Sequence, residues 1–169
     1  MPISAPEPLA PHHDLSGFDC GKTQLNNWLK NHARRNDEKG FTRVMVVCEG
    51  TRVIGYYGLA PTGVPGPSMP RSIRTGQAPD PIPGILFGQL AVDVAHKGKG
   101  IGSSLLRDAL QRCVAGAAAI GGRAVVVRAI DHEAEVYWQS NGFIPAIDDP
   151  SILFRSVVDI AAWLKVSAG

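Results

Sequence analysis

The sequence predicts an α+β fold in which helices pack on a mixed, mostly antiparallel sheet. Apolar residues alternate between helical and strand spacing, in the order helix, two strands, long loop, strand, helix, strand, helix, strand. The turn Glu49-Gly50-Thr51-Arg52 joins the first two strands and predicts an antiparallel hairpin. The later strands alternate with helices, so we expect a mixed sheet.

The first third of the chain contains one expected helix and the hairpin. Apolar residues at helical spacing predict a single amphipathic helix from about Lys22 to Lys39. Strands are expected over Thr42–Glu49 and Val53–Ala60. Because side chains alternate along a strand, we expect one of Tyr56 and Tyr57 in the core and the other facing a cleft.

A proline-rich segment follows the hairpin. Seven prolines and several glycines between Pro61 and Pro83 argue against a long helix or a central strand there. We expect a Pro/Gly-rich loop over residues 61–84, and loops of this length in small domains are usually functional or disordered. Arg71 and Arg74 lie inside it, where they can meet an anionic substrate or face water.

The remaining elements are bounded by glycines. Gly121-Gly122 separates a helix from the next strand, and Gly142 stops the helix after that. The expected elements are a strand to Asp93, a helix to about Ile120, a strand Arg123–Ala129, a helix of about Asp131–Asn141, a strand Ile152–Val158 and an apolar terminal turn Ile160–Leu164.

Composition bounds the class of protein. A chain of 169 residues with 44% hydrophobic and 19% charged residues suits one domain, residues 1–169, whose first 13 residues we expect to be loosely ordered. No apolar run approaches membrane-spanning length, and the start lacks a signal peptide, so we expect a cytoplasmic protein. The three cysteines are expected as buried free thiols, and the five histidines show no helix-spaced zinc pattern.

A glycine-spaced basic turn lies between the strand that ends near Asp93 and the following helix. Gly98, Gly100 and Gly102 remove the side chains that would hold a ligand away from the backbone. The turn's amides then point outward at the positive end of a helix, a site suited to a phosphate or pyrophosphate. The spacing fits neither a P-loop nor a dinucleotide fingerprint. We therefore expect a phosphate cradle formed by Lys97, Gly98, Lys99, Gly100, Ile101, Gly102 and Ser103.

This order of elements, with Lys97-Gly98-Lys99-Gly100-Ile101-Gly102 and the late segment Tyr137–Phe143, resembles the GNAT superfamily of N-acetyltransferases. In that family a Gln/Arg-x-x-Gly-x-Gly/Ala turn holds the pyrophosphate of coenzyme A, and Lys97 here replaces the usual first residue. The segments Phe18–Gly21, Gly55–Ala60 and Gln89–Asp93 look more specifically like the GNAT toxins of bacterial type II toxin–antitoxin modules. The resemblance covers nearly the whole chain.

The resemblance implies a GNAT-like fold with a splayed strand pair and helices on both faces of the sheet. It implies acetyl-CoA as cofactor, with backbone groups of Leu90, Ala91 and Val92 bonding the pantetheine arm and the thioester carbonyl. Main-chain donors aligned on that carbonyl would stabilise the developing oxyanion.

The family's leaving thiolate is commonly protonated by a tyrosine four residues before the glycine that ends the last helix. That position holds Trp138 here, and the tyrosine is Tyr137, one place earlier and about 100° around a helix. We take Tyr137 as the candidate acid, with Trp138 flanking the pantetheine or packing in the core. Asp131 stands where many family members carry a cofactor-contacting asparagine, and we expect it to cap the helix instead.

The toxin resemblance implies acetylation of the amino group of aminoacyl-tRNA, neutralisation by a small ribbon–helix–helix antitoxin, and a homodimer. A small-molecule amine, a protein N-terminus and an inactive coenzyme A-binding regulatory module remain alternatives. Basic side chains can steer an anionic substrate by its phosphates. The candidate substrate residues are Arg34, Arg35, Arg71, Arg74 and Arg128.

Overall fold

The computed structural model describes residues 2–168, and their contacts divide them into two compact units. Unit 1 contains the chain up to Ala60 together with Gly88–Ala109. Unit 2 contains Pro61–Phe87 and the chain from Leu110 onward. Three elements continue from one unit into the other, namely β3 (Arg52–Val64), β4 (Ile82–Val92) and α4 (Ile101–Ile120).

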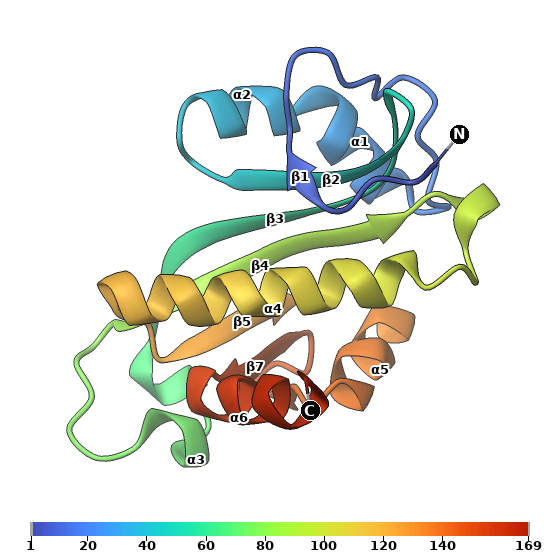
Figure 1. Cartoon of the computed structure of the whole chain (residues 1–169). Coiled ribbons are helices and arrows are strands. Elements are labelled where there is room, and N and C mark those ends of the chain that lie inside the picture. The colour runs from blue at the N-terminus through green and yellow to red at the C-terminus, as the bar shows by residue number, and fades with distance from the viewer. Residues whose placement is uncertain (1, 169) are drawn as a thin grey trace. The chain divides into compact units, whose positions relative to one another are not determined.

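Strands β1 (Glu7–Pro8), β2 (Arg43–Glu49) and β3 form antiparallel pairs in unit 1, and β4 follows β3 in the strand order (Figure 1). The β2–β3 pairing joins Val46 to Tyr56 and is interrupted by an irregularity between Val47 and Cys48. The predicted hairpin is confirmed.

The predicted helix from Lys22 to Lys39 is wrong, because the structure has two helices. Helix α1 (Thr23–Asn31) and helix α2 (Ala33–Glu38) are separated at His32, whose φ of −126° is not helical. The His32 amide donates to the Trp28 carbonyl and so ends the hydrogen bonds of α1. The His32 carbonyl accepts the Asn36 amide and so begins those of α2. The change of direction leaves Leu29 and Ala33 both fully buried, so burial overrides the continuous helical pattern.

The N-terminal segment is held in place rather than loosely ordered. Glu7 pairs with Val46 of β2, and Ile3 makes a bridge to Glu49. Arg34 donates from its guanidinium to the carbonyls of Ala10, at 3.0 Å, and of His13. These bonds tie the segment before α1 to both the sheet and α2.

Tyr56 and Tyr57 are both completely buried, which corrects the expectation that one faces a cleft. Tyr56 donates its hydroxyl to the Leu25 carbonyl at 2.7 Å and stacks parallel to Trp28. Tyr57 lies on the opposite face and donates to the Asp108 carboxylate of α4 at 2.5 Å. The alternation along β3 was predicted correctly, but α1 covers one face and α4 the other.

Gly55 allows α4 to pack closely on β3. A Cβ at this position would lie 2.9 Å from Leu105 Cδ1 and 3.2 Å from Ile101 Cγ2, two atoms of buried side chains. We expect Gly55→Ala to lower the free energy of unfolding by about 1–3 kcal/mol, the usual cost of overpacking. Urea denaturation followed by circular dichroism measures this change.

Gly116→Ala in α4 is the matched control. A Cβ there would have Ile85 Cδ1 at 3.9 Å as its nearest neighbour, an ordinary contact. Because glycine weakens a helix interior, this substitution raises the free energy of unfolding by about 0.5–1 kcal/mol. Equal effects of the two substitutions would contradict the packing argument.

Unit 2 contains the strand order β4, β5 (Ala124–Arg128), β7 (Ile152–Ser156) and β6 (Ile144–Pro145). Only the β4–β5 pair is parallel among the pairings described, which confirms a mixed, mostly antiparallel sheet. The β4–β5 ladder runs from Gly84–Ala124 to Phe87–Val127, and β4 then continues beyond its pairing with β5 to Val92. The complete strand order is β1-β2-β3-β4-β5-β7-β6.

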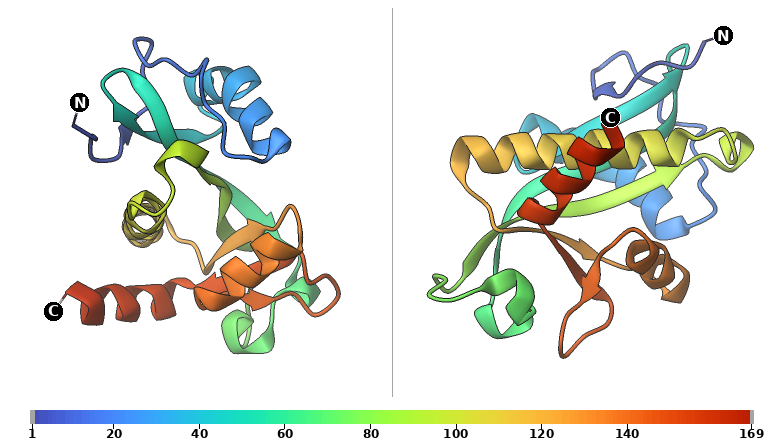
Figure 2. Two further views of the ribbon diagram at one scale, coloured as in Figure 1. Left: turned by 90° about the vertical axis from the view of Figure 1, so that its right-hand side faces the viewer. Right: turned by 60° about the horizontal axis from the view of Figure 1, so that its bottom comes forward.

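Helix α5 (His132–Ser140) and helix α6 (Val157–Ala168) both pack against β7 (Figure 2). The expected terminal turn Ile160–Leu164 is instead part of α6. Arg155 anchors the start of α6 through a 2.7 Å bond from Nε to Asp159, and its guanidinium lies 5.3 Å from the Trp163 ring centre. None of the described helices is long and apolar enough to cross a membrane.

The proline-rich loop is shorter than expected. Strand β3 continues through Pro61 to Val64, and β4 begins at Ile82 with Pro83 inside it. Between them lie a short 3₁₀ turn, Gly66–Ser68, and helix α3 (Arg71–Arg74). Met69 and Ile73 are buried with the core of unit 2, which orders the loop.

Candidate functional site

The glycine-spaced turn has the backbone geometry that the sequence predicts. A 3₁₀ turn, Val94–His96, precedes an extended Lys97, and α4 begins at Ile101. Gly98 and Gly100 have φ values of +82° and +80°, a conformation that side-chain-bearing residues rarely adopt. A Cβ at either position would have no described atom within 4 Å, so the space beside the turn is open to a ligand.

The first amides of α4 form the donor set of this turn. The first intrahelical bond runs from the Ser104 amide to the Gly100 carbonyl. The amides of Ile101, Gly102 and Ser103 precede it and have no carbonyl one turn earlier to bond. Together with the positive end of the helix dipole and the exposed Lys97 and Lys99, they give this turn N–H donors and positive charge of the kind that suits an anion. The turn therefore fits a diphosphate.

The end of β4 lies beside this donor set. A Cβ on Gly102 would sit 3.7 Å from Val92 Cγ2, which places the strand end against the first turn of α4. The Asp93 amide donates to the Ile54 carbonyl of β3 at 2.8 Å. Successive amides of a strand point to opposite edges, so the Val92 amide points away from β3. Leu90 and Val92 are half-buried and Ala91 is buried.

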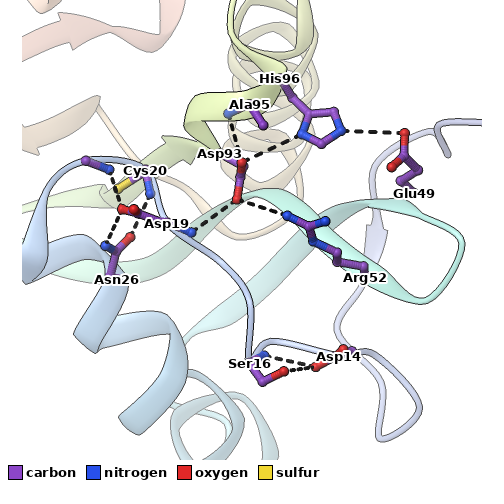
Figure 3. Close-up of polar contacts among 11 residues, drawn as sticks. Asp14, Ser16, Asp19, Cys20, Asn26, Glu49, Arg52, Asp93, Ala95 and His96 are labelled. Atoms are coloured by element: carbon purple, nitrogen blue, oxygen red, sulfur yellow. Dashed lines mark hydrogen bonds and ion pairs between the residues drawn. The ribbon is translucent and has the colours of Figure 1, made fainter.

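Asp93 connects three segments at the base of the turn (Figure 3). Its carboxylate is buried and accepts the Ala95 amide at 2.9 Å and the Asp19 amide at 3.1 Å. Arg52 of β3 brings its guanidinium within 3.8 Å of the same group. A buried charge that is paired in this way fixes the groups around it. Asp93 thus joins the segment before α1, strand β3 and the turn.

His96 lies between two carboxylates just before Lys97. Its Nδ1 is 3.7 Å from Asp93 and its Nε2 is 3.5 Å from Glu49, and the ring is buried (Figure 3). Asp19, whose amide binds Asp93, accepts the Gly21 amide and the Asn26 side chain with its own carboxylate, and these bonds lower the pKa of Asp19. The sequence alone does not reveal this cluster, because its members come from three separate segments, at residues 19–26, 49–52 and 93–96.

We expect Asp93→Asn to weaken binding of acetyl-CoA, the cofactor that the family resemblance implies, about tenfold. An amide group keeps only one acceptor and leaves a buried donor unpaired, at about 1–3 kcal/mol. Calorimetry with acetyl-CoA measures the change. Asp14→Asn is the control, since Asp14 is exposed and its carboxylate accepts from the amide and hydroxyl of Ser16 (Figure 3). If both variants lost the same affinity for acetyl-CoA, the assignment of a positioning role to Asp93 would be rejected.

Tyr137 and Trp138 lie on α5 in unit 2, and α5 begins as predicted. Asp131 accepts the Ala134 amide at 2.9 Å, which confirms its role as helix cap. Trp138 is buried and packs edge-on against Phe87 and Phe143, so the structure gives it a core role.

Tyr137 is 38% exposed and lies edge-on to Trp138. Partial burial raises the pKa of its hydroxyl. The chain has three tyrosines, and Tyr56 and Tyr57 are fully buried with their hydroxyls hydrogen-bonded. Tyr137 is therefore the tyrosine whose hydroxyl remains available to a reacting group.

The five candidate arginines divide between the units. Arg34 and Arg35 belong to unit 1, but Arg34 is half-buried and its guanidinium holds the N-terminal segment, whereas Arg35 is exposed. Unit 2 contains exposed Arg71 and Arg128 and half-buried Arg74. Arg34 thus has a structural role that the charge pattern did not reveal.

The cysteines are buried free thiols, as predicted. Burial raises the pKa of all three, to about 11 for Cys48 and about 12 for Cys113, so they are poor nucleophiles. Glu7, His12 and His13 place three possible metal ligand atoms within 4.8 Å of one another. The His13 Nδ1 accepts the Ala10 amide, so a neutral ring carries its proton on Nε2, facing Glu7 at 2.7 Å. This is a hydrogen-bonded pair rather than a prepared metal ligand.

Comparison with known proteins identifies relatives of this chain. The chain is 38% identical over 161 residues to a tRNA-acetylating toxin of Mycobacterium tuberculosis, with 95% of this chain and 96% of the relative covered. It is 37% identical to the probable toxin TacT of Sinorhizobium fredii, over 72% of this chain and 68% of the relative.

Solved structures match throughout the chain. AtaT complexed with acetyl-methionyl-tRNAfMet has a TM-score of 0.86 and 27% identity, covering 96% of this chain and 99% of that one. A Tyr-to-Phe mutant of KacT has a TM-score of 0.84 and 26% identity, covering 95% and 98%. A Tyr-to-Phe mutant of AtaT bound to acetyl-CoA and the C-terminus of the antitoxin AtaR has a TM-score of 0.82 and 27% identity, covering 98% and 99%.

A model of the acetyltransferase (GNAT) family matches residues 12–143, a range that includes the turn, Asp93 and α5. The enzymes of this family move an acyl group from acetyl-CoA to an amine. The chain belongs to the acetyltransferase (GNAT) family of acetyl-CoA-dependent N-acetyltransferases.

Proposed function

We propose that this protein acetylates the α-amino group of aminoacyl-tRNA in the cytoplasm and thereby stops translation as the toxin of a toxin–antitoxin pair. The observation that carries the proposal is the 38% identity, over 95% of the chain, to a tRNA-acetylating toxin. The similarity to AtaT in complex with acetyl-methionyl-tRNAfMet supports the same substrate class.

The turn between β4 and α4 would hold the diphosphate of coenzyme A. Its donors are main-chain amides that the positive-φ glycines turn outward, and Lys97 and Lys99 add charge beside them. The end of β4 would hold the pantetheine arm through the backbone of Leu90, Ala91 and Val92. The residues proposed to bind the diphosphate are Lys97, Gly98, Lys99, Gly100, Ile101, Gly102 and Ser103.

The chemistry suits an amine that needs little activation. Bound acetyl-CoA supplies a thioester whose carbonyl carbon the amine attacks. An α-amino group has a pKa near ~8, which the ester to tRNA lowers further, so a large neutral fraction exists at pH 7. A lysine side chain, with a pKa near ~10.4, would require a dedicated base. Backbone donors at the end of β4 would stabilise the negative charge that develops on the carbonyl oxygen.

Tyr137 is the proposed general acid, donating its phenolic proton to the departing thiolate. The attacking amine loses one proton to water as the amide forms, and the phenolate takes a proton back from water. The Tyr137 side chain is partly exposed, and its raised pKa keeps the hydroxyl protonated at neutral pH. Tyr-to-Phe mutants of AtaT and KacT among the similar structures direct attention to a tyrosine. Trp138 would support Tyr137 by packing against its ring rather than by contacting the cofactor.

Two partners belong to the proposal. AtaT has been solved with the antitoxin AtaR, which supports an antitoxin for this chain, and we propose the ribbon–helix–helix type together with a homodimeric toxin. Arg35, Arg71, Arg74 and Arg128 are the basic side chains proposed to meet tRNA phosphates; Arg34 is withdrawn from this set because it is committed to the N-terminal segment.

Incubation of the purified protein with acetyl-CoA and total charged tRNA tests the function. We expect N-acetylated aminoacyl-tRNA, and mass spectrometry of the released amino acids identifies which is modified. Deacylated tRNA is the control and should accept no acetyl group. Transfer to small amines or peptides with none to charged tRNA would overturn the proposal.

A further inference from the structure

Unit 2 contains a cavity of about 460 Å³ that lies open at its surface. It lies where the loop after α3 meets the start of β4 and the turn before β5. Among the residues that the structure describes, two arginines and no acidic side chain line it. Its walls are formed by Arg74, Thr75, Gln77, Ala78, Pro79, Ile82, Pro83, Gly122 and Arg123.

The two arginines of this Arg74–Arg123 cavity are held in fixed orientations. Arg123 donates from Nε to the Ile73 carbonyl at 2.6 Å, and Arg74 donates from Nη1 to the Gly66 carbonyl at 3.2 Å. The Arg123 backbone is also fixed, because its amide donates to the Pro83 carbonyl at 2.8 Å. A guanidinium has five N–H donors, so both groups keep donors for a ligand after these bonds.

The cavity wall is formed by backbone that is itself constrained. Thr75 has a positive φ of 48°, which few residues other than glycine adopt, and Gly122 has a φ of 144°. Asp80, an acidic residue of the same loop, accepts the Gly66 amide at 3.0 Å and does not line the cavity. Positive charge inside the cavity is therefore not matched by a carboxylate of its wall.

The lining chemistry defines the ligand. Two arginines in a concave site are the usual receptor for a phosphate group, because the guanidinium fork matches phosphate oxygens. Thr75 and Gln77 add polar groups, while Ala78 and Pro79 present apolar surface suited to a sugar or base. We propose that the Arg74–Arg123 cavity binds a phosphate group of a nucleotide, either in the tRNA chain or as a free nucleotide.

This inference deepens the proposed function. The assignment of the bound phosphate to tRNA rests on that function, and Arg123 joins the residues proposed to contact the substrate. The site takes the phosphate together with part of its nucleoside, so it fixes the position of one nucleotide. A basic surface alone would attract tRNA without this positioning.

The test uses two probes, deacylated total tRNA and adenosine 5′-monophosphate. The variants are Arg74→Gln, Arg123→Gln and the charge-conserving Arg123→Lys, with Lys165→Gln of α6 as the control for an exposed charge lost elsewhere in unit 2. Binding of tRNA is measured as a function of salt, and binding of the nucleotide by the NMR signals of the arginine Nε–H groups. Thermal unfolding checks that each variant is folded.

We expect Arg74→Gln and Arg123→Gln each to weaken tRNA binding about tenfold and to reduce the salt dependence by about one phosphate contact. Lys165→Gln should bind tRNA as tightly as the wild type. The affinity for acetyl-CoA should stay unchanged in all variants. A nucleotide that shifts the Arg74 and Arg123 signals, with tRNA binding unaffected in the variants, identifies a free nucleotide as the source. Wild-type binding of both probes by folded Arg74→Gln and Arg123→Gln would overturn the inference.

The outcomes separate this inference from the proposed function. Deacylated tRNA carries no acceptor amine, so its binding tests the cavity without acetyl transfer. If tRNA binding depends on the two arginines but charged tRNA is not acetylated, the binding role of the cavity is supported and the proposed function is rejected. The opposite outcome is acetylation of charged tRNA at the wild-type rate by folded Arg74→Gln and Arg123→Gln, with unchanged binding of both probes. It would support the proposed function and reject the binding role of the cavity.

Discussion

Replacing Tyr137 with phenylalanine lowers kcat for acetyl transfer at least about tenfold, because a positioned general acid contributes about 10²–10⁴-fold. The substitution removes one hydroxyl and keeps the edge-on packing against Trp138. The affinity for acetyl-CoA, measured by calorimetry, stays unchanged. Steady-state kinetics with charged tRNA measure the loss, and an unchanged kcat would reject the assignment of Tyr137.

The pH profile gives a second readout for Tyr137. An acid must be protonated to act, and burial raises the pKa of this hydroxyl above its ordinary value of 10. The rate should therefore rise as the substrate amine loses its proton, at a pH below ~8 because the ester to tRNA lowers the pKa of the amine, and should fall only above pH 10. Tyr137→Phe removes the fall at high pH. Tyr56→Phe, which loses the bond to the Leu25 carbonyl, is expected to affect stability and leave this profile intact.

Replacing Gly100 with valine weakens acetyl-CoA binding at least about 100-fold. A β-branched residue at a φ of +80° carries about 1–3 kcal/mol of strain. Relief of that strain turns the amides of the first α4 turn away, and each hydrogen bond to a charged group is worth about 1.5–3 kcal/mol. Loss of two such bonds accounts for the effect, which calorimetry measures directly.

Gly40→Val separates strain from ligand binding. Gly40 follows α2 with a φ of +78°, and a Cβ there would also meet no described atom within 4 Å. The backbone penalty is therefore the same as at Gly100, but no diphosphate site is involved. We expect equal losses of thermal stability in the two variants and a loss of affinity only in Gly100→Val. Parallel losses of affinity would show that the cradle assignment is wrong.

Local patterns predicted the elements whose signals lie within one segment of sequence. The turn from Asp93 to Ile101 is an example, because strand, glycines and helix follow one another within a few residues and the φ values confirm the glycine requirement. The Asp131 cap likewise depends on a bond to Ala134, three residues away. Such features need no knowledge of tertiary contacts.

Features that depend on distant residues were missed. The break at His32 follows from burial of Leu29 and Ala33 in one core. The burial of Tyr57 depends on Asp108, 51 positions later, and the Arg123 side chain is bound to a carbonyl 50 positions earlier. The role of Arg34 as an anchor of the N-terminal segment also arises from folding. Charge patterns alone cannot distinguish such an anchored arginine from a substrate-binding one.

The donors at the start of α4 belong to the main chain, and this bears on how the enzyme could be inhibited. A compound that imitates the diphosphate would bind main-chain amides, and among single replacements only proline removes a backbone N–H. Resistance to such a compound would require a different backbone conformation between β4 and α4. That change would also weaken binding of acetyl-CoA. Resistance and loss of activity would then arise from the same alteration.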